Sequence, residues 1–550
     1  MTTTTIPPPA TTPAATPTSA PAFTPTPAPA FTSTPAPAAT STSTPTPATA
    51  PVPTRASTLA RIASEPLDLL VIGGGIVGAG VARDAAMRGL RTALVDSRDF
   101  AQGTSSRSSR LLHGGLRYLE QGRVGLVRQS SVEKKIVHAI APHLGQPLGF
   151  IFPVYKVNGR PMWQMRIGVK LYDLLCGGRN FQPSRGFTIA ETTARLPQIN
   201  TATLRGSVRY YDALTSDARL TLDTLRSALN HGALVSNYTR FDDASRASPA
   251  APWRCELADT LTGARFTATA RAILNAAGPW AGNIPRNSVK LRLTKGIHIV
   301  VDRARVTVPE GEAVTMVEGK RILFLLPWGE RLIIGTTDTD YDARPEDVSV
   351  DAADIDYVLH TVNTTFPAVK LTRADIISSW AGVRPLIANR DGSPSDTSRA
   401  HQIKNPEPGW WDVTGGKLTT YRLMAEEAVD KIARHLKTPA APCRTAREPL
   451  LSAADAALYS GILPPAYGET AVRHYLENEW AVTLADVLIR RTSWHYYLPG
   501  MTARAQEVAH WMAAAAGWTP GRVAAELSAY AAESAKTWPG CAGAADNEKQ

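Results

Sequence analysis

The sequence predicts an α/β fold whose first unit is a strand, a glycine-rich turn and a helix. Residues 67–72 are a short apolar run typical of a buried parallel strand. The turn G-x-G-x-x-G follows, at Gly73, Gly75 and Gly78, and helix-forming residues continue to Arg88. A second apolar run, residues 92–95, predicts a strand that ends at an acidic residue.

Each part of this unit has a role in holding a dinucleotide. Gly73 permits the tight turn, Gly75 lets backbone N–H groups approach a pyrophosphate, and Gly78 lets the helix pack on the strand. The helix N-terminus attracts phosphate. Asp96 lies eighteen residues after Gly78, where a carboxylate can bind ribose hydroxyls. The turn alone is a weak signal, because structural βαβ units also carry it. The complete unit predicts dinucleotide binding.

Residues 103–120, "GTSSRSSRLLHGGLRYLE", are polar and glycine-rich where a core segment would be apolar. They begin seven residues after Asp96, with no immediate third βα unit. Their hydroxyl groups can bind a pyrophosphate and a ribityl chain. We therefore expect FAD rather than NAD, since FAD extends farther and its ring must be covered.

Composition separates an N-terminal segment from the rest of the 550 residues. Residues 1–64 are almost entirely Thr, Pro, Ala and Ser, with Arg55 and Arg61 as the only charged residues. Such a segment has too few large apolar groups to fold, so we expect a disordered tail. It lacks the basic start and apolar stretch of a signal peptide.

The net charge of +11 suits an anionic substrate, an anionic membrane surface or nucleic acid. No run of eighteen apolar residues occurs, so no transmembrane helix is expected. The four cysteines, Cys176, Cys255, Cys443 and Cys541, are far apart and form no CxxC pair. We therefore expect neither a metal cluster nor a disulfide framework, and a reducing compartment.

A long ordered series of segments carries a resemblance to a known family. It includes "IGGGIVGAGVARDAAMRGL", "TSSRSSRLLHGGLRYLE", "RPMWQMRIGVKLYDLL", "LNAAGPWAG", "KGIHIVV", "LLPWGERLIIGTTDTDY", "WAGVRPL" and "GGKLTTYRLMAEEAVDKI". Over residues 65–440 the chain resembles the FAD-dependent, quinone-linked glycerol-3-phosphate dehydrogenases. The resemblance implies a Rossmann-like FAD domain of the glutathione-reductase and D-amino-acid-oxidase type. It also implies an inserted antiparallel-sheet substrate domain and a helical C-terminal domain, residues 441–550, which looks shortened.

The resemblance also implies the reaction. A base removes the C2 hydroxyl proton of sn-glycerol 3-phosphate while a hydride moves from C2 to FAD N5, giving dihydroxyacetone phosphate. A membrane quinone then accepts the electrons. The basic and apolar segment 160–175 fits a helix lying on an anionic membrane, although a helix packed on its own domain fits equally well. We expect a cytoplasmic protein held peripherally on the inner face of the cell membrane, a homodimer, and no nucleic-acid partner.

The family match places seven residues at the reacting centre: His113, Arg117, Tyr118, Lys295, His298, Arg384 and Lys417. Arg384 is expected to hold the substrate phosphate, since arginine binds such anions with two parallel donors. A structural ion pair is its alternative role. His113 is the first candidate for the base, His298 is its competitor, and Lys295 is a candidate for polarising the substrate oxygen.

The residues expected to hold FAD surround the turn, the polar segment and two later glycine turns. They are Gly73, Gly75, Gly78, Asp96, Thr104, Ser105, Ser106, Ser109, Gly114, Gly115, Ala277, Gly278, Gly416, Lys417 and Thr419. The helix from Thr419 is expected to direct its N-terminus at the flavin. An ordinary βα turn with a solvated lysine is the alternative.

Three other functions remain. The nearest is a glycerol-3-phosphate oxidase that reduces O₂. A catalytically inactive flavin-binding scaffold is a second, and retention of His113, Arg117, Arg384 and Lys417 argues against it. An NAD-dependent dehydrogenase explains neither the polar segment nor "GGKLTTYR".

Overall fold

The computed structural model of the protein describes residues 52–156, 161–178, 180–319, 321–387 and 401–537. These residues belong to one unit of the chain, Ala48–Gln550. The part of the predicted tail up to residue 51, and Cys541, lie outside the described residues.

The first sheet contains the predicted nucleotide-binding unit. Its central strand β1 runs parallel to β2 and to β10, and β10 runs parallel to β18. The described order is β17-β18-β10-β1-β2-β7, with β8 and β9 joined through β10. The bounds are β1 Leu67–Ile72, β2 Thr92–Val95, β7 Leu234–Ser236, β8 Thr239–Ser245, β9 Trp253–Asp259, β10 Arg265–Asn275, β17 His401–Glu407 and β18 Trp410–Gly415.

Both faces of this sheet are covered, which explains why every residue of β1 except Asp68 is apolar. Leu69 and Val71 pack with the helices α2, α7 and α9, whose bounds are Ile76–Met87, Asp217–Asn230 and Tyr421–Leu436. Leu70 and Ile72 lie in a cluster on β8, β9 and β10. The predicted strands at residues 67–72 and 92–95 are confirmed, and the predicted helix begins two residues earlier than expected.

The structure differs from the expectation for the last ten residues of the predicted tail. Arg55–Ser64 forms helix α1, which Thr54 caps by accepting from the Ser57 N–H. Ile62 is fully buried in the cluster that contains Leu67 and Leu70. Arg55 donates to the Tyr238 carbonyl at 2.8 Å and pairs with Asp259 at 2.6 Å. One apolar anchor and one arginine therefore suffice to dock a helix that composition alone does not reveal.

The second sheet is formed by chain segments that alternate with those of the first. Its order is β15-β11-β14-β13-β12-β4-β6-β3, with β16 on β11 and β5 on β6. Most pairs are antiparallel, and β4 with β12 is parallel. The bounds are β3 Leu111–Leu112, β4 Gln146–Tyr155, β5 Arg185–Phe187, β6 Leu204–Leu214, β11 Leu291–Asp302, β12 Glu312–Glu318, β13 Arg321–Trp328, β14 Arg331–Gly335, β15 Thr339–Asp340 and β16 Ile376–Ile387.

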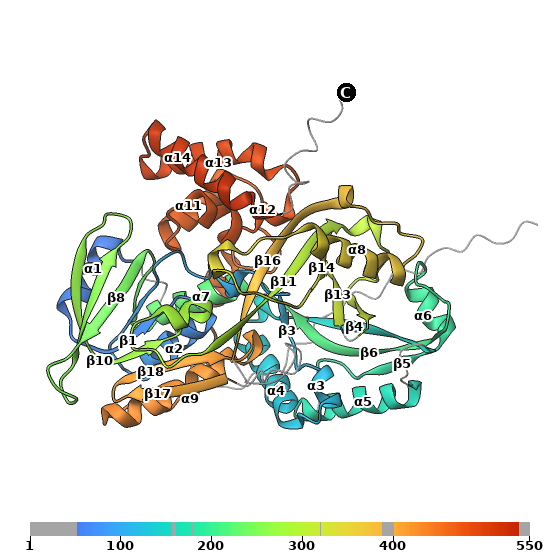
Figure 1. The fold of residues 1–550 in the computed structure, drawn as a ribbon, viewed down its shortest axis with the longest axis horizontal. Coiled ribbons are helices and arrows are strands. Elements are labelled where there is room, and N and C mark those ends of the chain that lie inside the picture. The colour runs from blue at the N-terminus through green and yellow to red at the C-terminus, as the bar shows by residue number, and fades with distance from the viewer. Residues whose placement is uncertain (1–51, 157–160, 179, 320, 388–400, 538–550) are drawn as a thin grey trace, which may run out of the picture. The chain divides into compact units, whose positions relative to one another are not determined.

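Helices cover both faces of the second sheet. One face carries α4 and α5 and the other carries α8. Figure 1 shows the two sheets side by side, and β16 of the second contacts β18 of the first. The helix bounds are α3 Arg117–Glu120, α4 Val124–Ile140, α5 Met162–Leu175, α6 Ile189–Arg195 and α8 Ala352–Thr365.

The last part of the described chain is helical, as expected. It contains α10 Ala453–Ala457, α11 Glu469–Asn478, a π-helix Asp486–Arg491, α12 Trp494–Tyr497, α13 Met501–Ala516 and α14 Pro520–Ser534. Trp494 and Tyr496 pack with Trp328 and Trp380 of the second sheet. The predicted fold class, a parallel nucleotide-binding sheet with an interleaved, mainly antiparallel sheet and C-terminal helices, is confirmed. Within the described ranges, no helix has both the length and the apolar character needed to span a membrane.

Candidate cofactor and substrate site

The glycine turn after β1 has the close contacts that its motif predicts. Gly73 has φ +109°, and a Cβ there would lie 2.6 Å from the Ala276 carbonyl oxygen. A Cβ on Gly78 would lie 1.9 Å from the Gly73 carbonyl oxygen, so only glycine lets α2 start this close to β1. Gly75 caps α2 with φ −78°, which any residue can adopt, and lies against a cavity.

That cavity has a volume of about 520 Å³ and extends from the end of β2 to the turn after β18. It borders Phe241 and Asp96 at one end, and His298 and Lys417 at the other. The predicted cofactor residues in its lining are Gly73, Gly75, Asp96, Thr104, Ser105, Ser109, Ala277, Gly278, Gly416 and Lys417. An elongated cavity that starts at the glycine turn suits an extended dinucleotide.

Asp96 lies at the carboxyl end of β2, where ribose recognition is expected. Its carboxylate accepts from the Gly74 N–H at 2.7 Å and from the Arg98 N–H at 2.9 Å. Burial raises its pKa to about 6, against the opposing effect of these two hydrogen bonds. Asp96 therefore binds the backbone of the glycine turn and also lines the cavity.

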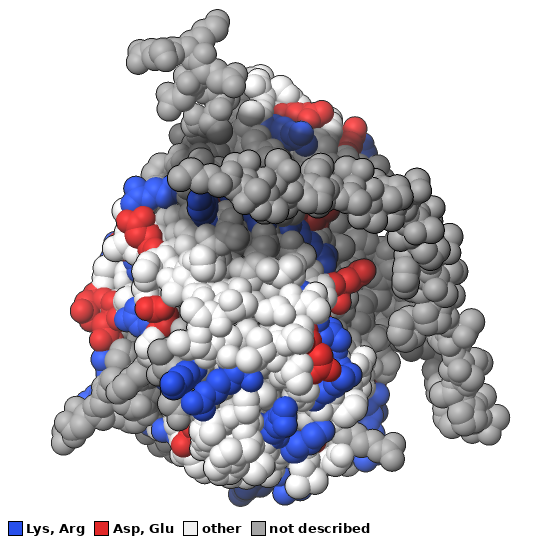
Figure 2. All heavy atoms as spheres, turned by 90° about the vertical axis from the view of Figure 1, so that its right-hand side faces the viewer, with Lys and Arg blue, Asp and Glu red and all other residues white. Residues whose placement is uncertain are grey.

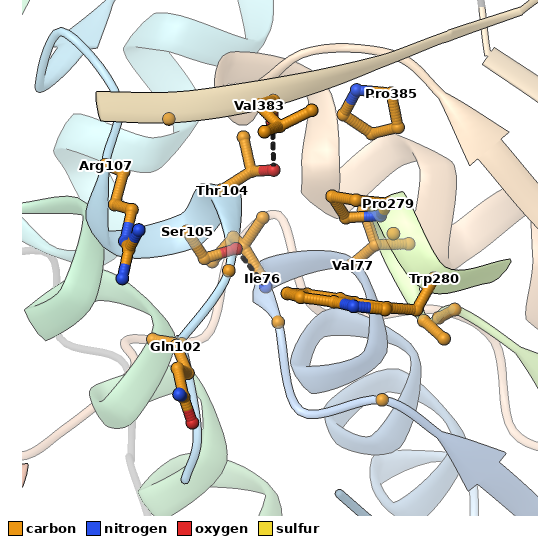
Figure 3. A pocket seen from close by; sticks show the side chains of 18 of the residues that line it. Ile76, Val77, Gln102, Thr104, Ser105, Arg107, Pro279, Trp280, Val383 and Pro385 are labelled. Atoms are coloured by element: carbon orange, nitrogen blue, oxygen red, sulfur yellow. Dashed lines mark hydrogen bonds between the residues drawn. The ribbon is translucent and has the colours of Figure 1, made fainter. Parts of the chain in front are cut away.

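The polar segment after Gly103 forms one wall of this cavity (Figure 3). The Ser105 hydroxyl accepts from the Ile76 N–H at 3.0 Å, at the start of α2. The Thr104 hydroxyl donates to the Val383 carbonyl oxygen of β16 at 2.6 Å. The segment thus joins the glycine turn to the second sheet.

A second cavity, of about 970 Å³, meets the first at its inner end. The two share Ser109, Leu111, His113, Phe324 and Arg384. Gly115, Arg117 and Tyr118 line the second cavity only. Of the residues predicted for the reacting centre, His113 and Arg384 line both cavities, His298 and Lys417 line the first, and Arg117 and Tyr118 line the second.

His113 is half-buried at this junction and is fixed through its backbone. The Thr419 hydroxyl accepts from the His113 N–H at 2.9 Å and donates to the His113 carbonyl oxygen at 3.2 Å. His113 lines both cavities.

His298 is 2% exposed and lies deeper in the same site. Its Nε2 is 2.8 Å from the Ser109 hydroxyl, and its ring stacks on Trp380 with centroids 5.0 Å apart. Burial, with the nearby charges of Arg384 and Arg110, lowers its pKa well below the usual value. His298 is therefore neutral and a weak base.

Three arginines line the second cavity: Arg117, Arg321 and Arg384. Arg384 of β16 donates to the Thr336 hydroxyl at 2.9 Å and pairs with Asp338 at 3.1 Å. Gly296 lies beside it, where a Cβ would be 2.3 Å from Arg384 Nη2. Arg117 is half-buried and makes no hydrogen bond or ion pair within the described residues.

Lys417 begins the turn that leads into α9. Its Nζ lies 4.1 Å from the centre of the Tyr118 ring and 3.4 Å from the Ser130 hydroxyl. Gly415 and Gly416 both have positive φ, so the tight turn predicted before this lysine is confirmed. The lysine borders the first cavity at its inner end.

Lys295 is not brought to either cavity, which corrects its expected place. Its Nζ lies 2.6 Å from both Asp351 and Asp354 at the start of α8. Successive side chains of a strand point to opposite faces, so Lys295 points away from the face of β11 that carries Gly296 and His298. Lys295 is therefore not placed to contact a ligand in either cavity.

Four expected cofactor residues support the cavity without lining it. Gly78 lets α2 approach β1, and Thr419 binds His113. Ser106 is buried beside the cavity wall. The Gly114 N–H donates to the Tyr172 hydroxyl at 2.8 Å and leaves no room for a Cβ. These four residues therefore position the residues that line the cavity.

Some lining residues were missed by the sequence reasoning. Trp280 and Gln102 border the first cavity (Figure 3), and Phe324 and Asp338 border the second. Trp280 ends the segment "LNAAGPW", so its position after a glycine turn was a usable signal. Phe324 lies within strand β13 and Asp338 in the loop between β14 and β15, and neither position carries such a signal.

The donor set fits FAD. The open space beside Gly75, the N–H groups at the start of α2, Asp96 at one end and the glycine turn of β18 at the other match what a flavin dinucleotide requires.

Comparison with known proteins decides the family. The family model "FAD dependent oxidoreductase" matches residues 68–431. The aerobic glycerol-3-phosphate dehydrogenase of Staphylococcus aureus strain USA300 is 38% identical over 395 residues, which are 70% of this chain and 71% of that protein. The chain belongs to the FAD-dependent glycerol-3-phosphate dehydrogenase family.

Solved structures agree with this family. The glycerol-3-phosphate dehydrogenase of Bacillus halodurans, complexed with FAD, has a TM-score of 0.70 and 28% identity, and the match covers 88% of this chain and 97% of that one. The L-α-glycerophosphate oxidase of Mycoplasma pneumoniae, with FAD bound, has a TM-score of 0.57 and 16% identity over 70% of this chain and all of that one. The second likeness shows the fold alone. FAD is the cofactor of this family, and the prediction of FAD is confirmed.

Proposed function

We propose that this flavoprotein oxidises sn-glycerol 3-phosphate to dihydroxyacetone phosphate and passes the electrons to a membrane quinone. The observation that carries the proposal is the junction of the two cavities. There His113 and Arg384 line both cavities, and Arg117 lines the second cavity. The names of the S. aureus and B. halodurans relatives support the same substrate.

Bound FAD supplies the two-electron acceptor. Arg384 and Arg117 hold the substrate phosphate from two elements, β16 and α3. Thr336 and Asp338 fix the Arg384 guanidinium, so its orientation is set before the substrate arrives. Such preorganised, partly desolvated cations bind a phosphate dianion strongly. The alternative is that the Arg384–Asp338 pair is only structural.

His113 is the base that takes the proton of the substrate C2 hydroxyl. It borders both cavities, and Thr419 fixes its backbone. His298 is the weaker candidate, because its pKa is far below its usual value and its Nε2 already contacts Ser109. We assign His298 and Ser109 to shaping the site, and Lys417 and Tyr118 to its wall beside FAD.

The second cavity supports a lipid-soluble acceptor. Ile167 and Leu171 of α5 line it, and both are exposed at the surface. Trp163 and Leu174 lie on the same helix, 65% and 64% exposed, with exposed Arg166 and Lys170 alongside. Figure 2, which views the molecule from the right-hand side of Figure 1, shows Lys and Arg gathered over the lower part of that face.

A basic helix with an exposed apolar stripe lies in a lipid interface. We therefore propose that the protein binds the inner face of the cell membrane through α5. Flotation with anionic vesicles tests this proposal, and Trp163→Ser with Leu174→Ser should abolish flotation. Sedimentation equilibrium tests the proposed homodimer.

Turnover with defined acceptors tests the function. The purified protein should oxidise glycerol 3-phosphate with a soluble quinone analogue and form little hydrogen peroxide in air. Peroxide formed in equal amount to the product, without quinone, would instead favour the oxidase. No turnover with either acceptor would favour the flavin-binding scaffold.

A further inference from the structure

The wall of the FAD cavity between Asp96 and Arg107 contains little regular structure of its own. Its one helical turn within this range is Thr104–Ser106. Two side chains of this wall, Asp99 and Arg107, pair with side chains of the C-terminal helical segment, and Asp99 also accepts from Asn237 Nδ2, directly after β7, at 3.1 Å. The wall is therefore held from a part of the chain more than 350 residues away.

The first anchor is a buried carboxylate. Asp99 is fully buried and pairs with Arg490 and Arg491, which end the π-helix. Arg491 Nη2 lies 2.9 Å from Asp99 Oδ1, and its other guanidinium nitrogen donates to Oδ2. Although burial opposes it, the two arginines lower the pKa of Asp99, so the carboxylate stays ionised.

This anchor reaches the pyrophosphate turn through one aromatic pair. Trp480 packs edge-on against Phe100, with ring centroids 5.4 Å apart. Phe100 is fully buried, and a Cβ on Gly74 would lie 2.3 Å from its ring. The Ala101 N–H donates to the Gly74 carbonyl oxygen at 3.1 Å. A displacement of Trp480 would thus move Phe100, and with it the backbone of the glycine turn.

The second anchor lies at the end of α14. Glu533 pairs with Arg107 at 2.7 Å and with Lys536 at 2.8 Å. Lys536 Nζ donates to the Glu346 carbonyl oxygen at 3.1 Å, and the Glu346 carboxylate accepts from Trp280 Nε1 at 2.9 Å. Both Arg107 and Trp280 line the FAD cavity.

Glu533 near the end of α14, and Lys536 just after it, therefore connect two sides of the cavity. Gly103 on the wall closely approaches Trp280, since a Cβ there would lie 2.8 Å from the indole ring. Figure 3 shows the wall residues Gln102 and Arg107, and Trp280, around the cavity.

We propose that the C-terminal helices retain FAD, with Glu533, Arg490 and Arg491 acting as positioning residues that keep the wall closed. A ligand under an anchored wall leaves only when the wall moves, so the anchors should slow FAD release more than FAD uptake. The proposal concerns the cofactor and is independent of the substrate.

The test measures FAD release from the holoprotein. Flavin fluorescence is followed after a large dilution into buffer without flavin, so that released FAD does not rebind. Glu533→Gln keeps the size of the side chain and removes the charge that holds Arg107, and we expect release to be about 3- to 30-fold faster. Glu469→Gln is the matched control, because it breaks an exposed pair with Arg473 on α11 of the same helical segment. It should release FAD at the wild-type rate.

Arg491→Lys tests the buried anchor, because lysine keeps the charge but cannot donate two parallel bonds to Asp99. It should also release FAD faster. If Arg491→Lys fails to fold, the rate of FAD release from Glu533→Gln tests the proposal by itself. Release from Glu533→Gln at the wild-type rate, or no faster than from Glu469→Gln, overturns the proposal.

Discussion

The hydroxyl of Thr419 closes two hydrogen bonds on the backbone of His113, at 2.9 Å to its N–H and 3.2 Å to its carbonyl oxygen. The two residues are 306 positions apart in the chain. One belongs to the polar segment of the first half, and the other to the turn that leads into α9. This contact sets the position of the proposed base.

Thr419→Val should lower kcat with glycerol 3-phosphate by about 10-fold, because a buried N–H loses its acceptor and His113 shifts. Flavin content should stay near that of the wild type, since Thr419 does not line the FAD cavity. Thr420→Val is the control, because its hydroxyl binds the Lys417 carbonyl and not His113. Steady-state kinetics that show equal losses in both variants would contradict the assignment.

Arg384→Ala should lower kcat/KM for glycerol 3-phosphate by about 30- to 1,000-fold, equivalent to roughly 2–4 kcal/mol, through loss of a charged contact to phosphate. Activity with plain glycerol should fall much less. Arg384→Lys should recover part of the loss. If the Ala variant is equally impaired on glycerol, Arg384 serves only its pair with Asp338.

Gly75→Val should fold and purify with less than about a tenth of the normal flavin, because the side chain fills space needed by the pyrophosphate. The backbone at Gly75 has an ordinary φ of −78° and a Cβ position 3.2 Å from the Ser105 hydroxyl, so the fold survives. Gly78→Val should fail to fold, given the 1.9 Å approach to Gly73. Circular dichroism and the flavin absorbance of both proteins distinguish these outcomes.

FAD affinity should rise with pH through the titration of Asp96. Its pKa in the cofactor-free protein is raised to about 6, so Asp96 is mainly protonated at pH 5 and mainly ionised at pH 7. Ribose hydroxyls donate to the ionised form, so affinity should increase by about 10-fold over this range. Fluorescence titration of the apoprotein measures it, and Asp96→Asn should remove the dependence.

The same raised pKa has the opposite effect on the apoprotein. A group that is easier to protonate in the folded state stabilises the fold below its unfolded pKa, and this contribution is lost as pH rises through the folded value of about 6. When the pH is raised from 4 to 7, the melting temperature of the apoprotein should therefore fall relative to that of Asp96→Asn.

Two truncated proteins distinguish the contribution of α1 from that of the residues before it. Deletion of residues 1–51 should leave flavin content and turnover unchanged, as the composition of that segment predicts. Deletion of residues 1–64 should lower the melting temperature by several degrees, because it removes buried Ile62 and the Arg55–Asp259 pair. Equal melting temperatures for the two proteins would mean that α1 contributes nothing.

The sequence was most informative where one residue type satisfies one steric demand. Gly73 and Gly78 could be assigned because no other residue fits their contacts. The sequence was least informative about which face of a strand borders the cavity. Lys295 and His298 are three positions apart on β11, so they lie on opposite faces and cannot both border one cavity. The spacing excludes the pair, but only the fold shows that His298 faces inward.

Contacts between distant segments were also invisible in the sequence. Nothing near Asp99 indicates that Arg490 and Arg491 will bury it, and nothing in α1 beyond Ile62 indicates docking. Thr419 was placed beside the cofactor because it follows the glycine turn. Its hydroxyl instead points to His113, since the turn brings the two backbones together.

The central claim is that glycerol 3-phosphate reduces the bound flavin at the site formed by His113, Arg117 and Arg384. An anaerobic titration tests it most directly, because it needs no acceptor. One equivalent of glycerol 3-phosphate per flavin should bleach most of the yellow absorbance, glycerol at the same concentration should not, and a quinone analogue added afterwards should restore the colour. Flavin that stays oxidised with excess glycerol 3-phosphate, yet bleaches with dithionite, would contradict the account.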